Sequence, residues 1–340
     1  MGKLVCFGEI MGRLSPPGYL KTVQADEFGL TFAGGEANVA VSVANYGGEA
    51  KFVTRLPDND LTEHALRVLR GYRVDVDDVV IGGERMGLYF VEKGASQRPS
   101  KVLYDRRYSA IAAAQASDFK WDRIFEGASW FHFTGITPAL SDSLAEICAE
   151  ACAAAKRRGM TVSCDLNYRK NLWPSEKAGE VMAGLMRGVD VCIANEEDAD
   201  KVFGIRAADT DVSGGRLSRE GYRSVAEQLS ERFGIGRVAI TLRGSISASD
   251  NSWAGILWEN GALYASREYR IHLVDRVGGG DSFGGALIYA LMQNYDPQQA
   301  IEFAVAASCL KQATEYDFSQ SKVADVRKLM DGDGSGRVQR

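Results

Sequence analysis

The chain has 340 residues, of which 45% are hydrophobic, and a formal net charge of -5. This length supports a full core, in one large α/β domain or two smaller ones. The mild negative charge argues against general nucleic-acid binding, which needs a positive field, and no apolar run approaches the roughly 18 residues of a membrane span. With this length and no secretory signal, we expect a protein of the reducing cytoplasm, and because none of its six cysteines forms a CxxC pair we expect core thiols rather than metal ligands.

The first half of the chain alternates short apolar runs with helical patterns. We expect strands at 4–7, 51–54 and 130–134, and helices at 35–46, from 58 to about 70, and from 141 to 158. Two segments, 11–32 and 74–108, carry β-like patterns punctuated by Pro and Gly. Because they do not fit a doubly wound core, they predict a small additional sheet.

The second half continues the alternation. We expect strands at 161–165, 189–194 and 238–242, antiparallel strands at 247–258 and 264–273, and helices at about 221–233, 280–293 and 297–314. Apolar strands that alternate with helices of ten or more residues predict βαβ units and a parallel sheet. The fold class is therefore α/β. Residues 331–340, rich in Gly and Asp, are expected to form a flexible tail.

The strongest local motif is a run of three glycines and an aspartate, Gly278 to Asp281, at the start of an alanine-rich helix. Glycine lets a ligand approach the backbone, and a helix N-terminus adds free N–H groups and partial positive charge. Such a site suits a phosphate in transfer, and a carboxylate beside it can accept a hydroxyl proton. Two other interpretations remain open at this point, a helix cap by Asp281 and a dinucleotide-binding turn. The spacing, however, is not GxGxxG.

A second motif lies at another loop-to-helix junction. Gly34 and Gly35 precede a helical pattern that contains Asn38. Backbone that a polyhydroxyl ligand can approach, together with an amide side chain, suits sugar binding. This motif favours the phosphate-transfer interpretation of the first one.

Together the two segments resemble the ribokinase-like (PfkB) carbohydrate kinase family. Its C-terminal signature, roughly D-T-x-G-A-G-D, is matched from Asp275 to Asp281, with Arg276 in place of Thr and Gly279 in place of Ala. Its N-terminal signature, G-G-x-x-x-N-x-A, is matched from Gly34 to Ala40. The two signatures are about 240 residues apart in the expected order, and the resemblance extends to about residue 330.

The resemblance implies a Rossmann-like α/β domain over residues 1–330 with a small β-sheet lid, whose strands come from about 11–32 and 74–108. It implies an ATP-dependent kinase that uses Mg²⁺ and forms a homodimer through the lid. Asp281 is then the catalytic base, and the backbone of Gly278, Gly279 and Gly280 forms the anion hole. Sugar contacts are implied for Gly34, Gly35 and Asn38.

The same resemblance suggests a nucleotide and metal side of the site. The family's N-x-x-E motif is matched by Asn195 and, with a shorter acid in the last position, by Asp198. Asp198 is expected to act on Mg²⁺ through water, since Mg²⁺ keeps several waters. Thr241, Arg243 and Gly244 follow a strand and are expected to contact the nucleotide. The alternatives are that Asn195 is a helix N-cap and that Arg243 is a solvated loop residue.

Four residues point to a sugar acid. Tyr89, Tyr104 and Arg106 lie in the expected lid, and Arg169 follows a buried strand at the edge where α/β sheets bind ligands. Arginine is the bidentate partner of carboxylates. These stretches look like 2-keto-3-deoxygluconate kinases, which implies that the sugar acid is phosphorylated on its 6-hydroxyl. Alternatively, Tyr89 is a strand aromatic and Arg169 a surface cation.

Two rival functions stay open. A kinase of a neutral sugar such as fructose or ribose would keep Asp281 and the anion hole but would not need Arg106 and Arg169. A non-catalytic sugar or nucleotide sensor would have the same fold, because fold alone does not establish function.

Overall fold

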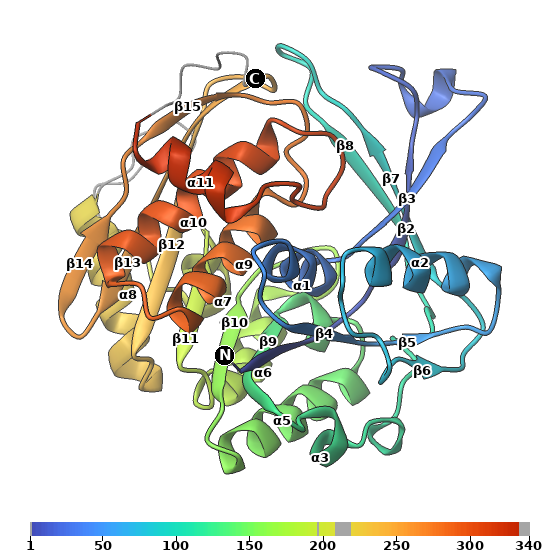
Figure 1. Ribbon diagram of the computed structural model, residues 1–340, viewed down its shortest axis with the longest axis horizontal. Coiled ribbons are helices and arrows are strands. Elements are labelled where there is room, and N and C mark those ends of the chain that lie inside the picture. Colours follow the sequence, from blue (N-terminus) through green and yellow to red (C-terminus); the bar gives the residue numbers. More distant parts are fainter. Residues whose placement is uncertain (1, 196, 208–218, 333–340) are drawn as a thin grey trace.

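Helices pack on both faces of one large sheet in the computed structural model, which describes residues 2–195, 197–207 and 219–332 (Figure 1). Within these residues the sheet has nine strands in the order β14-β13-β12-β11-β10-β9-β1-β4, with β15 also paired to β13. The strands from β4 to β12 are parallel, and β13, β14 and β15 are antiparallel. Their bounds are β1 Lys3–Phe7, β4 Ala50–Val53, β9 Ala128–Thr134, β10 Thr161–Asp165, β11 Val191–Ala194, β12 Arg237–Ser245, β13 Asp250–Glu259, β14 Ala262–Ala265 and β15 Tyr269–His272.

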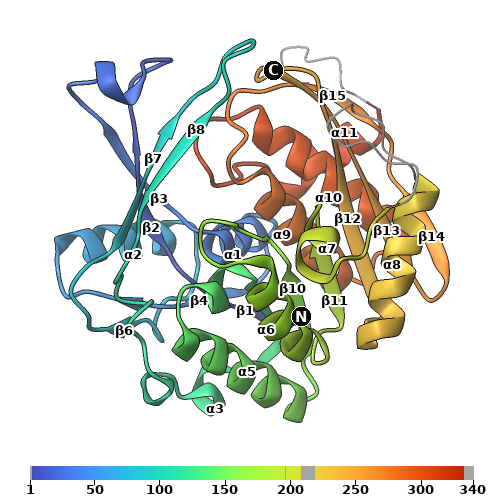
Figure 2. The ribbon, with the colours of Figure 1, turned by 180° about the vertical axis from the view of Figure 1, so that it is seen from behind.

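Strand β1 shows why both faces of the sheet are covered. Leu4 and Cys6 belong to one hydrophobic cluster and Val5 and Phe7 to another, because successive side chains of a strand point to opposite faces. The first cluster includes α1 Gly35–Asn45, α2 Asp60–Gly71, α9 Gly279–Met292, α10 Pro297–Gln312 and α11 Val323–Met330. The second includes α3 Trp121–Ile124, α5 Asp142–Arg157, α6 Ser175–Met186, α7 Asp198–Phe203 and α8 Arg219–Phe233 (Figure 2). The short helix α4, Ile136–Ala139, follows β9. The predicted α/β fold is confirmed.

Most of the predicted helices form within a residue or two of the expected bounds. The Ser141 side chain accepts a hydrogen bond from the Leu144 N–H and begins α5, and Gly159 adopts φ +69° just after that helix. Helices α6 and α11 were not predicted. Helix α6 contains two glycines, which weaken the helical pattern, and α11 has only eight residues.

The expected strand 264–273 is two strands. Strand β14 pairs with the end of β13, at Ile256 to Glu259, and β15 pairs with its start, at Asp250 to Trp253. Ser266 marks the break, because its hydroxyl accepts from the Gly255 N–H and donates to its neighbour's carbonyl. The prediction of one continuous strand was wrong because this local side-chain bonding interrupts the ladder.

A small sheet of four strands stands beside the main sheet (Figure 1). The strands, in the order β3-β2-β7-β8, are β2 Met11–Ser15, β3 Gly29–Ala33, β7 Gly87–Glu92 and β8 Lys101–Asp105. The segments 11–32 and 74–108 supply most of these residues, and β8 is exposed along its whole length. Shorter elements are β5 Arg55–Leu56 paired with β6 Val80–Ile81, and the 3₁₀ helices η1 Thr22–Gln24 and η2 Ala116–Asp118.

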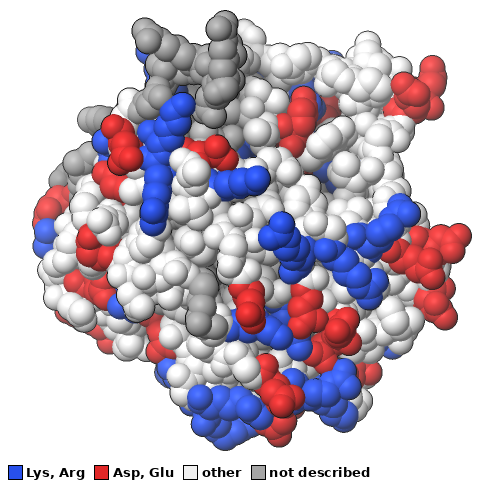
Figure 3. Space-filling model, viewed as in Figure 1, with Lys and Arg blue, Asp and Glu red and all other residues white. Residues whose placement is uncertain are grey.

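Charged side chains of both signs are interspersed on the face shown in Figure 3, as the small net charge predicts. Among the helices that the structure describes, none has the length and hydropathy of a membrane span. Of the expected tail, residues 333–340 lie outside the described part of the chain.

Candidate active site

A cavity of about 300 Å³ lies between the small sheet and the carboxyl ends of the parallel strands. The main sheet contributes residues just after β1, β10 and β11, among them Glu9 and Asn195. The small sheet contributes Tyr89 and Tyr104, and α9 contributes its first turn. The carboxyl edge of a parallel sheet is where α/β proteins bind ligands. Each of the two sequence motifs supplies residues to this cavity.

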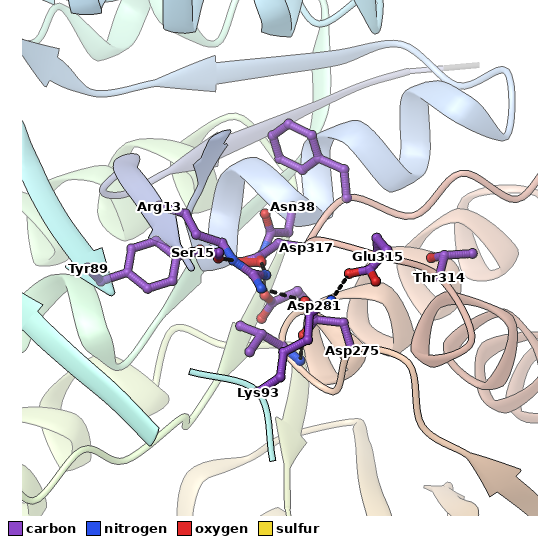
Figure 4. Close-up of polar contacts among 12 residues, drawn as sticks. Arg13, Ser15, Asn38, Tyr89, Lys93, Asp275, Asp281, Thr314, Glu315 and Asp317 are labelled. Carbon is purple, nitrogen blue, oxygen red and sulfur yellow. Dashed lines mark hydrogen bonds and ion pairs between the residues drawn. The ribbon is translucent and has the colours of Figure 1, made fainter. Parts of the chain in front are cut away.

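The two glycine-containing junctions are joined by a hydrogen bond across the cavity (Figure 4). Asn38 Nδ2, in the first turns of α1, donates to Asp281 Oδ2 of α9 at 2.6 Å. Asn38 Oδ1 accepts from the Gly34 N–H at 3.3 Å, so the amide is held from both sides. Asn38 therefore orients the carboxylate of Asp281 toward the space that both motifs share.

The environment of Asp281 suits a general base. Burial raises its pKa to about 6, with a further rise from the charge of Asp317, while the hydrogen bond from Asn38 lowers it. A carboxylate whose pKa lies closer to neutrality accepts a proton more readily than an ordinary aspartate. The raised pKa of Asp281 makes it the candidate general base of this cavity.

The three glycines before Asp281 have different environments. Gly278, the N-cap of α9, adopts φ +81°, and a methyl group on it would collide with the backbone carbonyl of Asp317. Gly280 is exposed and lines the cavity. Gly279 is buried against Gln312 and does not line the cavity. A helix leaves the N–H groups of its first turn without partners in the helix, so this turn can hold an anion.

Arg106 and Arg169 both line the cavity but differ in their partners. Arg106 is buried, and its Nε donates to Glu9 Oε2 at 2.7 Å, with a second bond from Nη2 to the same oxygen. Ser109 Oγ donates to the other oxygen of Glu9 at 2.6 Å. Arg169 is exposed and donates to the carbonyl of Tyr168 at 3.0 Å. Glu9 was not foreseen from the sequence, where its one signal is its place two residues after the first buried strand, Lys3–Phe7.

The two tyrosines of the small sheet stack on each other with ring centroids 6.1 Å apart. Tyr89 is buried, and its hydroxyl donates to Asp317 Oδ1 (Figure 4). Tyr104 is exposed, and the guanidinium of Arg106 lies over its ring at 5.4 Å. Tyr104 therefore presents its ring and hydroxyl to a ligand, whereas the Tyr89 hydroxyl already has a partner. Asp317, in the loop after α10, was also not foreseen from the sequence.

Two further carboxylates line the cavity, because Asp165 is the last residue of β10 and Asp198 is the first residue of α7, which follows β11. Both oxygens of Asp198 accept backbone N–H groups, from Tyr168 at 3.1 Å and from Asn195 at 3.0 Å. Burial raises the pKa of Asp198. Burial and the charges of Asp198 and Asp281 raise the pKa of Asp165 well above its usual range. Neighbouring carboxylates thus add to the effect of burial on the pKa of Asp165, and the charge of Arg169 acts in the opposite direction on Asp165 and Asp198.

Of the expected nucleotide contacts, Asn195, Thr241 and Arg243 line the cavity. The guanidinium of Arg243 lies over the ring of Trp253, 5.4 Å from its centroid. Gly244 does not line the cavity and is paired with Ser252 in the ladder between β12 and β13.

Glu36 is a further buried acid at the start of α1 that the sequence analysis did not single out. Its Oε1 accepts from the N–H and hydroxyl of Thr134, at 3.0 and 2.8 Å, and from the Thr137 hydroxyl at 2.6 Å. Burial raises its pKa to about 6, against the effect of these hydrogen bonds. Glu36 thereby joins the sugar-binding motif to the end of β9.

The chain matches the model of the pfkB family carbohydrate kinases over residues 1–317. It belongs to this family. The chain is therefore a phosphotransferase that acts on a carbohydrate, and the expected family membership is confirmed.

Individual members of the family resemble the whole chain. A solved structure of a 2-dehydro-3-deoxygluconokinase from Thermotoga maritima is 49% identical, with a TM-score of 0.94 over 98% of this chain and 100% of that one. A 2-dehydro-3-deoxygalactonokinase from Haloferax volcanii is 31% identical over 98% of each chain. A 2-dehydro-3-deoxygluconokinase from Thermoproteus tenax is 29% identical, over 91% of this chain and 88% of the relative.

Proposed function

We propose that this pfkB-family kinase transfers the γ-phosphate of ATP to the 6-hydroxyl of 2-dehydro-3-deoxygluconate, also called 2-keto-3-deoxygluconate. The observation that carries the proposal is the placement of two arginines, Arg106 and Arg169, in the same cavity as Asp281. A keto-acid has one carboxylate to bind and a hydroxyl at the other end to activate. The relatives named above support the same class of substrate.

Asp281 is assigned the proton-transfer step. Its carboxylate, oriented by Asn38, accepts the proton of the attacking hydroxyl as the oxygen forms a bond to the γ-phosphorus and the bond to the β-phosphate oxygen breaks. The N–H groups of Gly278 and Gly280, which line the cavity, donate to the phosphate oxygens, where negative charge must be held, whereas the Gly279 N–H donates to the Arg276 carbonyl at 3.3 Å. The sign and position of these groups match the needs of an in-line transfer.

The sugar acid is assigned to the side of the cavity beneath the small sheet. The exposed guanidinium of Arg169 binds the carboxylate of the sugar acid. Arg106 contributes the edge of its guanidinium that is not bonded to Glu9. Tyr104 contacts the sugar chain, and Gly34, Gly35 and Asn38 approach its hydroxyls. Tyr89 lines the same side.

We assign Mg²⁺ to the part of the cavity that Asp165 and Asp198 line, where, among the residues that the structure describes, no group of three His, Cys, Asp or Glu side chains is arranged to hold the ion directly. Asp165 and Asp198 are hard oxygen donors, and because both oxygens of Asp198 already accept backbone N–H groups, it would hold the ion through water. Held there, Mg²⁺ would neutralise charge on the phosphates of ATP. We assign to the nucleotide the part of the cavity that is lined by Asn195, Thr241 and Arg243. Gly244 does not line the cavity and is given no contact with the nucleotide, because it is paired with Ser252 within the sheet.

The small sheet is assigned a second role as a lid and as the contact of a homodimer. Its edge strand β8 exposes Val102 and Leu103 at 36% and 53%, and Val23 near β3 is 90% exposed. Apolar residues gathered along an unpaired strand favour contact with a second copy. Sedimentation of the wild type and of Leu103→Glu tests this, and a dimer that the substitution leaves intact counts against the assignment.

An ADP-release assay with Mg-ATP tests the function. The acceptors are 2-dehydro-3-deoxygluconate, its galactonate epimer, fructose and ribose. Preference for a keto-acid supports the proposal, and the Haloferax volcanii relative makes the epimer the second candidate. Preference for a neutral sugar would leave a sugar kinase without a carboxylate site. Turnover of none of the four would contradict the proposed acceptor and favour a sensor.

A further inference from the structure

Arg13 joins parts of the molecule that are far apart in the sequence. It lies in β2 of the small sheet and is fully buried, with 0% of its surface exposed. Its Nη2 bonds to Asp275 Oδ2 and its Nη1 to Asp317 Oδ2, while its Nε donates to Ser15 Oγ at 2.9 Å (Figure 4). Because every guanidinium nitrogen has a partner, the plane of the group is fixed.

The first of these carboxylates shapes the anion hole. Asp275 Oδ1 accepts the Val277 N–H at 3.0 Å, which folds the turn that leads into Gly278. Lys311 stabilises the same turn, since its Nζ donates hydrogen bonds to the backbone carbonyls of Asp275 and Val277. The position of Asp275 therefore sets where α9 begins.

The second carboxylate, that of Asp317, lies between the part of the cavity that we assign to the sugar acid and the anion hole. Asp317 lines the cavity, accepts the Tyr89 hydroxyl, and packs its backbone carbonyl against Gly278. The two residues before it also contact the small sheet. Lys93 pairs with Glu315, and Arg13 lies over the ring of Tyr316 at 5.5 Å. The segment from Glu315 to Asp317 is thus held between the small sheet and the start of α9.

We propose that Arg13 is a positioning residue that couples the binding of the sugar acid to the binding of the nucleotide phosphates. Arg13 does not line the cavity, so it acts through Asp275 and Asp317. A ligand that moves the small sheet moves Arg13, and the anion hole follows because both carboxylates are bonded to one rigid group. By linkage, phosphate at the anion hole then strengthens sugar binding by the same factor.

This inference rests on the proposed function, in which the sugar acid binds beneath the small sheet and phosphate binds at Gly278 to Gly280. The test is titration calorimetry of a non-hydrolysable ATP analogue with Mg²⁺, with and without saturating 2-dehydro-3-deoxygluconate. For the wild type we expect the sugar acid to tighten nucleotide binding at least about fivefold, the lower end of usual coupling. Nucleotide binding that the sugar acid leaves unchanged in the wild type would overturn the inference.

Arg13→Lys is the decisive variant, because lysine keeps the buried positive charge but cannot span two carboxylates as a fork. We expect the coupling factor to fall below about twofold and kcat to fall about tenfold, while each ligand alone binds within about threefold of wild type. A folded Arg13→Lys enzyme with wild-type coupling and kcat would refute the role of Arg13. Should this variant not fold, Tyr89→Phe, which removes one bond between the small sheet and Asp317, must weaken the coupling for the inference to stand.

Lys51→Met provides the control for lost stability. Lys51 is also buried, at 6% exposure, and pairs with Asp78, but neither residue lines the cavity. This variant should unfold at a lower temperature and keep the wild-type coupling factor. Failure of the proposed function is seen separately, as absence of wild-type turnover with either keto-acid, whereas failure of this inference leaves that turnover intact.

Discussion

Glu9 holds the guanidinium of Arg106 along one edge, with a single carboxylate oxygen that accepts from both Nε and Nη2. The charge of Arg106 is therefore already balanced by a buried acid before any ligand arrives. Arg169 is exposed, and among the residues that the structure describes its charge acts on Asp165, Asp198 and Asp281 without a direct ion pair, so its guanidinium can still bind the carboxylate of a sugar acid. This asymmetry separates two arginines that are equivalent in the sequence.

Arg169→Ala should raise KM for 2-dehydro-3-deoxygluconate by about 10- to 100-fold, the value of a hydrogen-bonded charge pair. Because Arg169 is exposed, its loss should leave the unfolding temperature almost unchanged.

Arg106→Ala should weaken substrate binding and, in addition, lower the free energy of unfolding by about 3–5 kcal/mol, since it leaves the buried charge of Glu9 without its cationic partner. Steady-state kinetics and thermal unfolding of both variants check this, with Arg169→Lys as the charge-preserving control. Equal stability losses in the two alanine variants would contradict the asymmetry.

Asp281→Asn should lower kcat by about 10²- to 10⁴-fold, the usual contribution of a general base, while nucleotide binding changes little. Asp296→Asn is the matched control, because Asp296 is also an acid at a helix N-terminus, where it accepts from the Gln299 N–H at 2.9 Å. Single-turnover kinetics and calorimetric nucleotide titration measure the two effects. Turnover in Asp281→Asn close to that of the Asp296 variant would remove Asp281 from the role of base.

The pH dependence of kcat/KM should show an acid limb near pH 6. Burial raises the pKa of Asp281 to about 6, and a base must be deprotonated, so activity is present above this pH and is lost as the pH falls through it. Because the hydrogen bond from Asn38 lowers that pKa, Asn38→Ala should shift the acid limb to higher pH. An acid limb that does not move in the Asn38 variant would show that another group controls it.

Gly278→Ala should lower stability, whereas Gly280→Ala should leave it unchanged. Alanine at position 278 would have to adopt a φ of +81°, which strains any residue other than glycine, and its methyl group would collide with the backbone carbonyl of Asp317. The substitution should therefore lower the free energy of unfolding by about 1–3 kcal/mol. At position 280 a methyl group meets no atom within 4 Å. Gly280→Ala should therefore keep its stability but weaken ATP binding, because Gly280 lines the cavity and a methyl group there takes up space beside the bound phosphate. Denaturant unfolding and nucleotide titration of the pair check this, and a destabilised Gly280→Ala would contradict it.

Local signals in the sequence predict much of the fold. Apolar runs such as Leu4–Phe7 indicate buried strands, and capping residues such as Ser141 mark helix ends, because these signals depend on neighbours within a few residues. The glycine runs before Asp281 and Asn38 likewise indicate two loop-to-helix junctions with room for a ligand. The break between β14 and β15 was not visible, because it depends on a bond between Ser266 and Gly255.

The sequence by itself determined the α/β class, the kinase motifs and the identity of the expected base. Only the tertiary structure decided which charges are free and which are already paired. Glu9 and Arg106 are 97 residues apart, and Arg13 and Asp317 are 304 residues apart. Periodicity and capping report on a single helix or strand, whereas an ion pair depends on the distance between elements that the chain brings together only on folding. Partners of this kind set the charge, the pKa and the orientation of the groups around Asp281.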